Sequence, residues 1–269
     1  MRVIAELLVK PGTDARLDQR PTDAKLGLVD KSHAAAKLAS LHIRLFELQE
    51  RLWAEEERAL LVVLQAIDAG GKDGTIRSVF TGVNPQGVRV VSFKVPAGRE
   101  MRQDYLWRVH ANCPGHGEIG IFNRSHYEDV VAVRVHELVP EKQWRRRYHH
   151  IEEFERLLSD EGTRIVKIFL HISREEQRGR LQARIDDPKK NWKFRTGDLE
   201  DRARWDDLMA AYEDALTKTS TEWAPWYVIP ADRKWVRNVA VSTLLVETLE
   251  AMNPQYPPPE IGIGSIKVV

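Results

Sequence analysis

The segment 66–74 has the composition of a loop that binds an anion through its backbone. It reads AIDAGGKDG, with Gly70, Gly71 and Gly74 around Lys72. Glycines let successive backbone N–H groups face one anion without Cβ clashes, and a helix that starts at the loop adds its positive end. Lys72 would place a point charge on the same phosphate. We therefore predict a phosphate-binding loop, with contacts from Ala69, Gly70, Gly71, Asp73, Gly74 and Thr75.

Two positions depart from the common phosphate-loop pattern, Gly-x-x-x-x-Gly-Lys followed by Ser or Thr. Ala66 stands at the first glycine, and Asp73 stands where the hydroxyl residue would hold Mg²⁺. Asp68, inside the loop, offers a carboxylate beside the phosphate oxygens, which is a natural magnesium ligand. The alternative is that the glycines only make a tight turn after a strand.

The surrounding segments predict an α/β fold. Residues 60–67, LLVVLQAI, form a continuous apolar run that suits a strand buried on both faces of a parallel sheet. Further strands are expected at 88–95, 118–123, 164–172 and 225–230. Helices are expected at 32–59, 72–80, 100–110, 125–136, 143–162, 175–187 and 233–252. Because strands and helices alternate, we predict a parallel five-stranded sheet flanked by helices.

Composition narrows the function classes. The 269 residues carry a net charge of +1, and no RNA-recognition signature is found, so no nucleic-acid partner is expected. The single cysteine, Cys113, excludes a disulfide framework within the chain and fits a reducing cytoplasm. No apolar run approaches the roughly 20 residues of a membrane helix. We expect a cytoplasmic protein without a membrane partner.

Three segments in order resemble polyphosphate kinase family 2, and within it the group that acts on both AMP and ADP. They are DAGGKDGTI at 68–76, IGIFNRSHYEDV at 119–130 and DDPKKNWKF at 186–194. The resemblance implies a P-loop kinase fold related to thymidylate kinases, with a helical lid. It also implies Mg²⁺-dependent phosphate transfer between inorganic polyphosphate and adenine nucleotides, with Mn²⁺ as a substitute metal, in a homodimer or homotetramer.

The second segment ends a short apolar strand, where ligands bind in open α/β sheets. Many members of the family have Asp where this chain has Asn123, a weaker magnesium ligand. Glu128 and Asp129 follow within about a turn and are candidates for the missing charge, although acidic residues also favour a solvated helix N-terminus. Arg124 carries a planar fork suited to phosphate oxygens. The metal candidates are Asp68, Asn123 and Asp129.

The third segment resembles the lid of the family. Lids exclude water and bring cations onto the transferring group. Arg184 matches the family's lid arginine, and Arg180, one turn earlier, is a candidate for binding the nucleotide or polyphosphate. Lys189, Lys190 and Lys193 are candidates for holding the phosphate chain. A solvated basic loop is the alternative.

The resulting hypothesis is a single P-loop kinase domain over residues 1–269. It has an irregular N-terminal arm at 1–31, a lid at about 178–210 and a C-terminal tail at 253–269. The catalytic candidates are Asp68, Lys72, Arg124 and Arg184. Two rivals stand beside it, an ATP-dependent nucleoside monophosphate kinase on the same fold and a non-enzymatic nucleotide-binding module.

Overall fold

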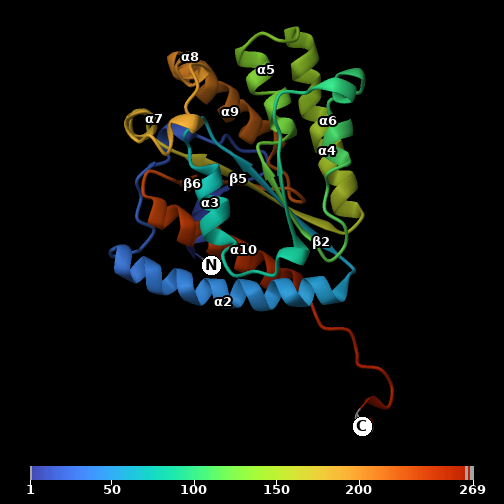
Figure 1. Ribbon diagram of the computed structural model, residues 1–269. Helices are drawn as coiled ribbons and strands as arrows, with labels where there is room; N and C mark the ends of the chain where they lie inside the picture. The colour runs from blue at the N-terminus through green and yellow to red at the C-terminus, as the bar shows by residue number, and fades with distance from the viewer. Residues whose placement is uncertain (1, 264–265, 267–269) are drawn as a thin grey trace.

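A six-stranded sheet organises the computed structural model, which describes residues 2–263 and 266 (Figure 1). The strand order is β1-β6-β5-β2-β4-β3. The strands are β1 Leu8–Val9, β2 Ala59–Gln65, β3 Val88–Ser92, β4 Ile119–Asn123, β5 Thr163–His171 and β6 Trp226–Pro230. From β6 to β3, each strand runs parallel to its neighbours. All seven residues of β2 are buried, as the apolar run predicted.

The sheet is mixed, so the prediction of five parallel strands was wrong. The five expected strands are present, but β1 adds a sixth that runs antiparallel to β6, with Val9 opposite Trp226. Within the expected arm, residues 2–31 contain α1 (Arg2–Leu7), β1 and the 3₁₀ segment η1 (Leu17–Gln19). The pairing joins segments at opposite ends of the chain, so the local pattern around two strand residues could not reveal it.

Helices surround the sheet (Figure 1). The α-helices are α1 Arg2–Leu7, α2 Lys31–Glu55, α3 Lys72–Val79, α4 Trp107–His110, α5 Ala132–Val135, α6 Glu141–Asp160, α7 Arg174–Asp186, α8 Gly197–Ala203, α9 Trp205–Thr219 and α10 Lys234–Met252. The 3₁₀ segments are η1 Leu17–Gln19, η2 Pro85–Gly87, η3 Gly98–Arg102, η4 His126–Asp129 and η5 Asn191–Lys193. Among the described residues, no helix combines the length and apolarity that spanning a membrane requires.

The longest helix, α2, begins at a capped end. The Asp30 carboxylate accepts a hydrogen bond from the His33 backbone N–H at 2.8 Å, which favours a helix start. Leu45, Leu48 and Leu52 lie on the buried face of α2, and α2 packs along α10 (Figure 1). In α10, buried residues are found around the circumference, because α10 also packs against α3 and β6.

Two expected helices are each replaced by a 3₁₀ segment followed by a short α-helix. In 100–110, the Asp104 carboxylate accepts hydrogen bonds from the backbone N–H groups of Leu106 and Trp107, at 2.9 and 3.1 Å. The chain therefore forms η3 and then α4 instead of one helix. In 125–136, Ser125 caps η4 in the same way, and α5 follows.

The structure also contains a helix that we did not expect. Residues 205–219 form α9, in which Leu208, Tyr212 and Leu216 recur at helical spacing and are buried. At the other end of the chain, Pro254 is buried, and the following residues leave the body of the molecule (Figure 1). Residues 264–265 and 267–269 of the expected tail lie outside the described part of the chain.

Candidate functional site

The glycine-rich segment forms the connection between β2 and α3, at the carboxyl edge of the parallel strands. Gly71 is the N-cap of α3 with φ of 104°, and Ala69 also has a positive φ of 60°. A Cβ on Gly71 would collide with the guanidinium of Arg237, so only glycine fits there. The first N–H groups of α3 have no partner within the helix and are available to an anion.

Lys72 lies folded into this loop. Its side chain is 9% exposed, and Nζ donates a hydrogen bond to the Ala66 carbonyl at 2.7 Å. Burial, followed by the charge of Arg124, lowers the pKa of Lys72 to about 8, while Asp68 and Glu128 oppose that shift. Lys72 is therefore mostly charged at neutral pH.

Asp68 and Arg124 form the central ion pair of the site. Arg124 Nη2 donates to Asp68 Oδ1 at 2.6 Å, and Arg124 Nη1 lies 4.0 Å from Glu128 Oε2. Burial would raise the pKa of Asp68, but the charges of Arg124 and Lys72 lower it below the ordinary value. An anionic carboxylate and two cations thus meet at the loop.

Asp201 on α8 joins this group and was not predicted. Burial, followed by the hydrogen bond with the Asp68 carboxyl, raises the pKa of Asp201 to about 6, while His136 opposes that shift. His136 Nε2 lies 2.9 Å from Asp201 Oδ1. The available signal was the acidic pair Asp198 and Asp201, three residues apart on one face of a helix that follows the basic lid segment.

The donor set only partly fits a divalent cation. The carboxyl oxygens of Asp68 and Asp201 converge, and two such groups need a proton or a cation between them. Asn123 directs its amide Nδ2 to Asp73 Oδ1 at 2.8 Å. Across residues 2–263 and 266, no group of three or more His, Cys, Asp or Glu side chains is arranged to hold a metal.

Asp129 faces other partners. Arg147 Nη1 on α6 lies 3.2 Å from Asp129 Oδ1, and burial raises the pKa of this carboxyl. In the described part of the chain, no hydrogen bond or ion pair joins Asp129 to Asp68. Its role as a metal ligand stays a prediction, and Asp201 occupies the position beside Asp68 instead.

The lid candidates divide into two groups. Arg184 pairs with Asp198 at 3.3 Å, and its charge acts on Asp68. Lys193 Nζ lies 3.8 Å from Asp73 Oδ2, which brings η5 to the glycine loop. Lys190 pairs with Asp187 on its own segment at 2.6 Å, and Lys189 is exposed, so neither lies at the loop through a described contact.

Arg180 and Tyr212 hold the loop through its carbonyl groups. Arg180 Nη1 donates to the carbonyl oxygens of Ala69 and Gly70, at 3.1 and 2.9 Å. The Tyr212 hydroxyl donates to the Ala66 carbonyl at 3.2 Å. Arg180 was predicted as a phosphate ligand, whereas Tyr212 was missed because it belongs to the unexpected helix α9.

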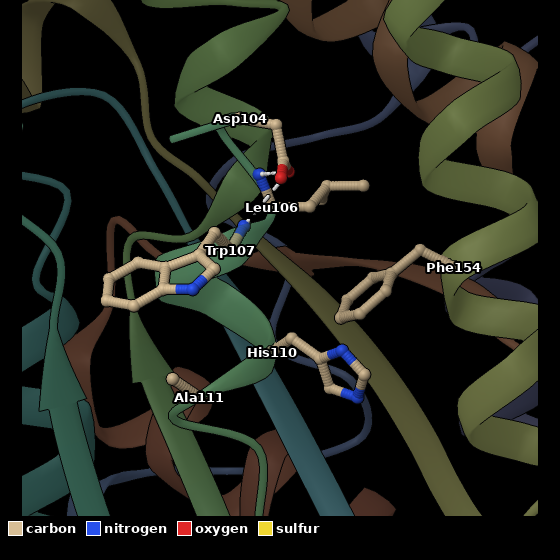
Figure 2. Close-up of a pocket in the computed structure, with 6 residues that line it drawn as sticks. All are labelled: Asp104, Leu106, Trp107, His110, Ala111 and Phe154. Carbon is tan, nitrogen blue, oxygen red and sulfur yellow. Dashed lines mark hydrogen bonds between the residues drawn. The ribbon is translucent and has the colours of Figure 1, made fainter. Parts of the chain in front are cut away.

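A cavity of about 400 Å³ lies between α4 and α6. Figure 2 shows His110 of α4 beside Phe154 of α6, and Trp107 of α4 with its ring turned away from Phe154; all three line the cavity. Asp104 reaches the same cavity, and its carboxylate accepts the two backbone hydrogen bonds that start α4 (Figure 2). The cavity is therefore bounded by aromatic side chains on elements outside the glycine loop.

Comparison with known proteins finds one family and relatives whose names agree with it. The family model described as Polyphosphate kinase 2 (PPK2) matches residues 28–257. An AMP/ADP-polyphosphate phosphotransferase from Meiothermus ruber is 61% identical over 94% of this chain and 94% of that protein. An ADP-polyphosphate phosphotransferase from Rhodopseudomonas palustris is 46% identical over 93% of this chain and 90% of that protein.

Solved structures agree in fold. The crystal structure of Polyphosphate Kinase 2 from Arthrobacter aurescens TC1 superposes with a TM-score of 0.93 at 41% sequence identity. The match covers 98% of this chain and 94% of that one. The similarity therefore extends over the glycine loop, the carboxyl edge of the sheet and the lid segment together.

Proposed function

This chain belongs to the polyphosphate kinase 2 family, and from that premise we propose that it moves phosphoryl groups between inorganic polyphosphate and adenine nucleotides. The proposed reactions convert AMP to ADP and ADP to ATP, and both are reversible. The observation that carries the proposal is the convergence of Lys72, Asp68 and Arg124 at the glycine loop. In this assignment the loop is a phosphate-binding P-loop and residues 178–210 are its lid.

The proposed chemistry is a direct in-line transfer. An oxygen of the acceptor's terminal phosphate forms a bond to the terminal phosphorus of polyphosphate, while that phosphorus loses its bond to the bridging oxygen of the shortened chain. The acceptor oxygen is already anionic, so no general base is needed. Lys72 and the loop N–H groups hold the phosphates, and Arg124 and Arg184 neutralise charge on the transferring group.

A divalent cation is part of the proposal. Asp68 and Asp201 would hold Mg²⁺, or Mn²⁺ in its place, and the cation would supply charge neutralisation between phosphate oxygens. The converging carboxyl groups support this assignment. A cytoplasmic location and a homodimer or homotetramer complete the proposal, on the basis of the single cysteine and the family resemblance.

The test is an acceptor screen with purified protein and magnesium. Polyphosphate is supplied with either AMP or ADP, ATP replaces polyphosphate in a parallel set, and products are separated by chromatography. We expect ADP and ATP to form from AMP only with polyphosphate, because the AMP/ADP-polyphosphate phosphotransferase of M. ruber matches the chain over nearly its full length.

The other outcomes are equally informative. Product from ADP alone would restrict the acceptor range, as in the name of the R. palustris relative. Transfer to AMP from ATP, with no effect of polyphosphate, would overturn the proposal in favour of a nucleoside monophosphate kinase. Binding without turnover in either set would leave a nucleotide-binding module.

A further inference from the structure

Three basic residues lie at the N-terminus of α10, the end of a helix at which positive charge is least favourable. Arg233 is the N-cap, Lys234 is the first helical residue, and Arg237 lies one turn further on. The first turn contains no acidic residue. Since the N-terminal end of a helix is itself positive, these side chains are unfavourable there unless an anion neutralises them.

Arg237 is the buried member of this group. Its side chain is only 3% exposed, and Nε and Nη2 donate only to the Asn238 amide oxygen on the same helix, at 3.1 and 2.8 Å. No carboxylate pairs with Arg237 anywhere in the described chain, and no hydrogen bond from its Nη1 is found there. A buried cation without an anionic partner is costly, so a ligand that supplies the anion would be favoured.

The guanidinium of Arg237 points at the glycine loop. Its Nη1 occupies the space where a Cβ of Gly71 would lie, and its Nη2 lies 3.5 Å from the Cβ position of Gly74. Arg180 Nη1 lies 3.3 Å from the same Cβ position of Gly71. Two guanidinium groups from α7 and α10 therefore flank the loop that precedes Lys72.

The carboxylates nearby do not balance this charge. Glu176 pairs with Arg180 at 2.7 Å, and Asp23 lies 3.6 Å from Arg233. Asp232 accepts hydrogen bonds from the Thr22 hydroxyl and the Ser173 backbone. Burial and then the charge of Arg180 lower the pKa of Arg237 to about 10, which still leaves it charged at neutral pH.

We infer that Arg237, with Arg180, forms a second anion subsite beside the glycine loop, which holds the phosphate units that follow the one at Lys72. The inference rests on the proposed function for the identity of the ligand, an oligophosphate chain. A planar guanidinium suits bridging phosphate oxygens, and the basic start of α10 continues the path outward through Lys234. The triphosphate of a nucleotide has the same chemistry, so the experiment compares both.

The first arm measures kinetics of Arg237→Met, Arg237→Lys and a control, Arg156→Gln. Arg156 lies on α6, outside the lid, is exposed and has its own carboxylate, Asp160. Loss of a charge-assisted contact predicts that Arg237→Met raises the KM for polyphosphate roughly 10- to 100-fold and leaves the KM for ADP within about twofold. Arg237→Lys should recover part of that loss, and Arg156→Gln should match the wild type.

The second arm measures thermal unfolding in phosphate-free buffer and with tripolyphosphate or ATP. Replacing an unpaired buried charge by an apolar side chain of similar length should leave the Tm of Arg237→Met equal or higher without ligand. The Tm increase caused by tripolyphosphate should shrink in this variant. A residue that merely supports the loop would instead lower the Tm without ligand and affect both KM values.

The outcomes separate this inference from the proposed function. An unchanged KM for polyphosphate and an unchanged tripolyphosphate shift in Arg237→Met would overturn the subsite. A shift reduced for ATP but not for tripolyphosphate would assign it to a nucleotide and would also overturn the inference. If the wild type transfers nothing from polyphosphate, the proposed function fails, while the Tm shifts still decide whether Arg237 binds an oligophosphate.

Discussion

At the scale of single residues, the site is a set of buried charges that depend on one another. Lys72 is buried among Asp68, Glu128 and Arg124, and its pKa reflects all of them. Such groups respond to pH in the range in which the protein is studied, because burial brings their pKa values toward neutrality. Two residue-scale predictions follow from this arrangement.

The first concerns the pH dependence of phosphate binding. Lys72 carries its charge below a pKa of about 8 and loses it above, so kcat/KM for polyphosphate should fall about tenfold per pH unit above pH 8. The native pKa is lower than the ordinary value, so charged Lys72 disfavours folding below pH 8, and this penalty is relieved as the pH rises toward about 10.5. Activity and stability should therefore change in opposite directions.

Lys72→Arg is the control, since an arginine keeps its charge over this range. The decline above pH 8 should disappear in that variant, even if its maximal rate is lower. A wild-type profile that stays level to pH 10 would contradict the assignment of the titrating group.

The second prediction concerns Asp68→Asn. The substitution keeps the shape of the side chain but removes the charge that pairs with Arg124 and is assigned to the cation, so turnover should fall by about 100-fold or more. The midpoint of urea unfolding should change little. Asp160→Asn, an exposed position at the end of α6 and outside the lid, should keep full turnover, and full turnover in Asp68→Asn would exclude a catalytic role.

The sequence predicted those site residues that lie in one short segment or directly after a predicted strand. Lys72 and Asp68 lie in a single loop, and Arg124 directly follows a strand whose end must lie at the same sheet edge. Asp201 and Arg237 come from helices far along the chain, and only packing brings them to the loop. Asp129 was chosen for its proximity to Arg124 in sequence, but Arg147 on α6 pairs with it.

At the scale of elements, a buried polar network joins η4 to α6 and β5. Glu155 on α6 accepts hydrogen bonds from the Tyr127 hydroxyl at 2.8 Å and from His126 Nε2 at 3.2 Å. Lys167 on β5 donates to the other Glu155 oxygen at 2.6 Å, and all four side chains are fully buried. Two successive residues of η4 are thus held just before Glu128, whose carboxylate lies near Arg124.

Breaking this network should be strongly destabilising. Glu155→Gln leaves the Lys167 charge buried without its carboxylate, so we expect a loss of about 3–5 kcal/mol in the free energy of unfolding, measured by urea titration. Glu141→Gln, which alters an exposed pair on the same helix, should change it by less than about 0.5 kcal/mol. The double variant Glu155→Leu with Lys167→Met should recover much of the loss. Equal free energies of unfolding for Glu155→Gln, Glu141→Gln and the double variant would refute the stabilising role of the network.

The same scale shows which elements a sequence can predict. Four of the five parallel strands, β2, β4, β5 and β6, were found because each is a mostly buried apolar run between helices, whereas β3, at the edge of the sheet, is partly exposed. The prediction of one helix at 100–110 was wrong because the local hydrogen bonds of Asp104 start a new helix inside the segment. Strand β1 was missed because its stability comes from pairing with β6 and not from its own two residues.

At the scale of the whole molecule, the central strand β2 separates two sets of elements. The basic groups on α7 and α10 follow β5 and β6, on one side of β2 in the sheet. Asn123 and the cavity beside α4 follow β4 and β3, on the other side. We therefore predict that the donor and the acceptor of the proposed reaction reach the glycine loop from different sides at the same time.

This division predicts sequential kinetics. Direct transfer requires both substrates together, so double-reciprocal plots at several fixed acceptor concentrations should intersect. A phosphorylated-protein intermediate would give parallel lines and a stable incorporation of phosphate. The single cysteine is a poor alternative nucleophile, because burial raises the pKa of Cys113 to about 12. Parallel lines would contradict direct transfer.

The antiparallel pairing of β1 with β6 has a consequence for synthesis on the ribosome. Leu8 and Val9 emerge first, but their partners Tyr227 and Trp226 are added more than two hundred residues later. At about 5–20 residues per second, this delay is on the order of 10–40 s. The apolar face of α2 also waits for α10 throughout that time. The nascent chain therefore exposes these apolar segments until β6 and α10 have been synthesised, and chaperone binding would protect them most during that interval.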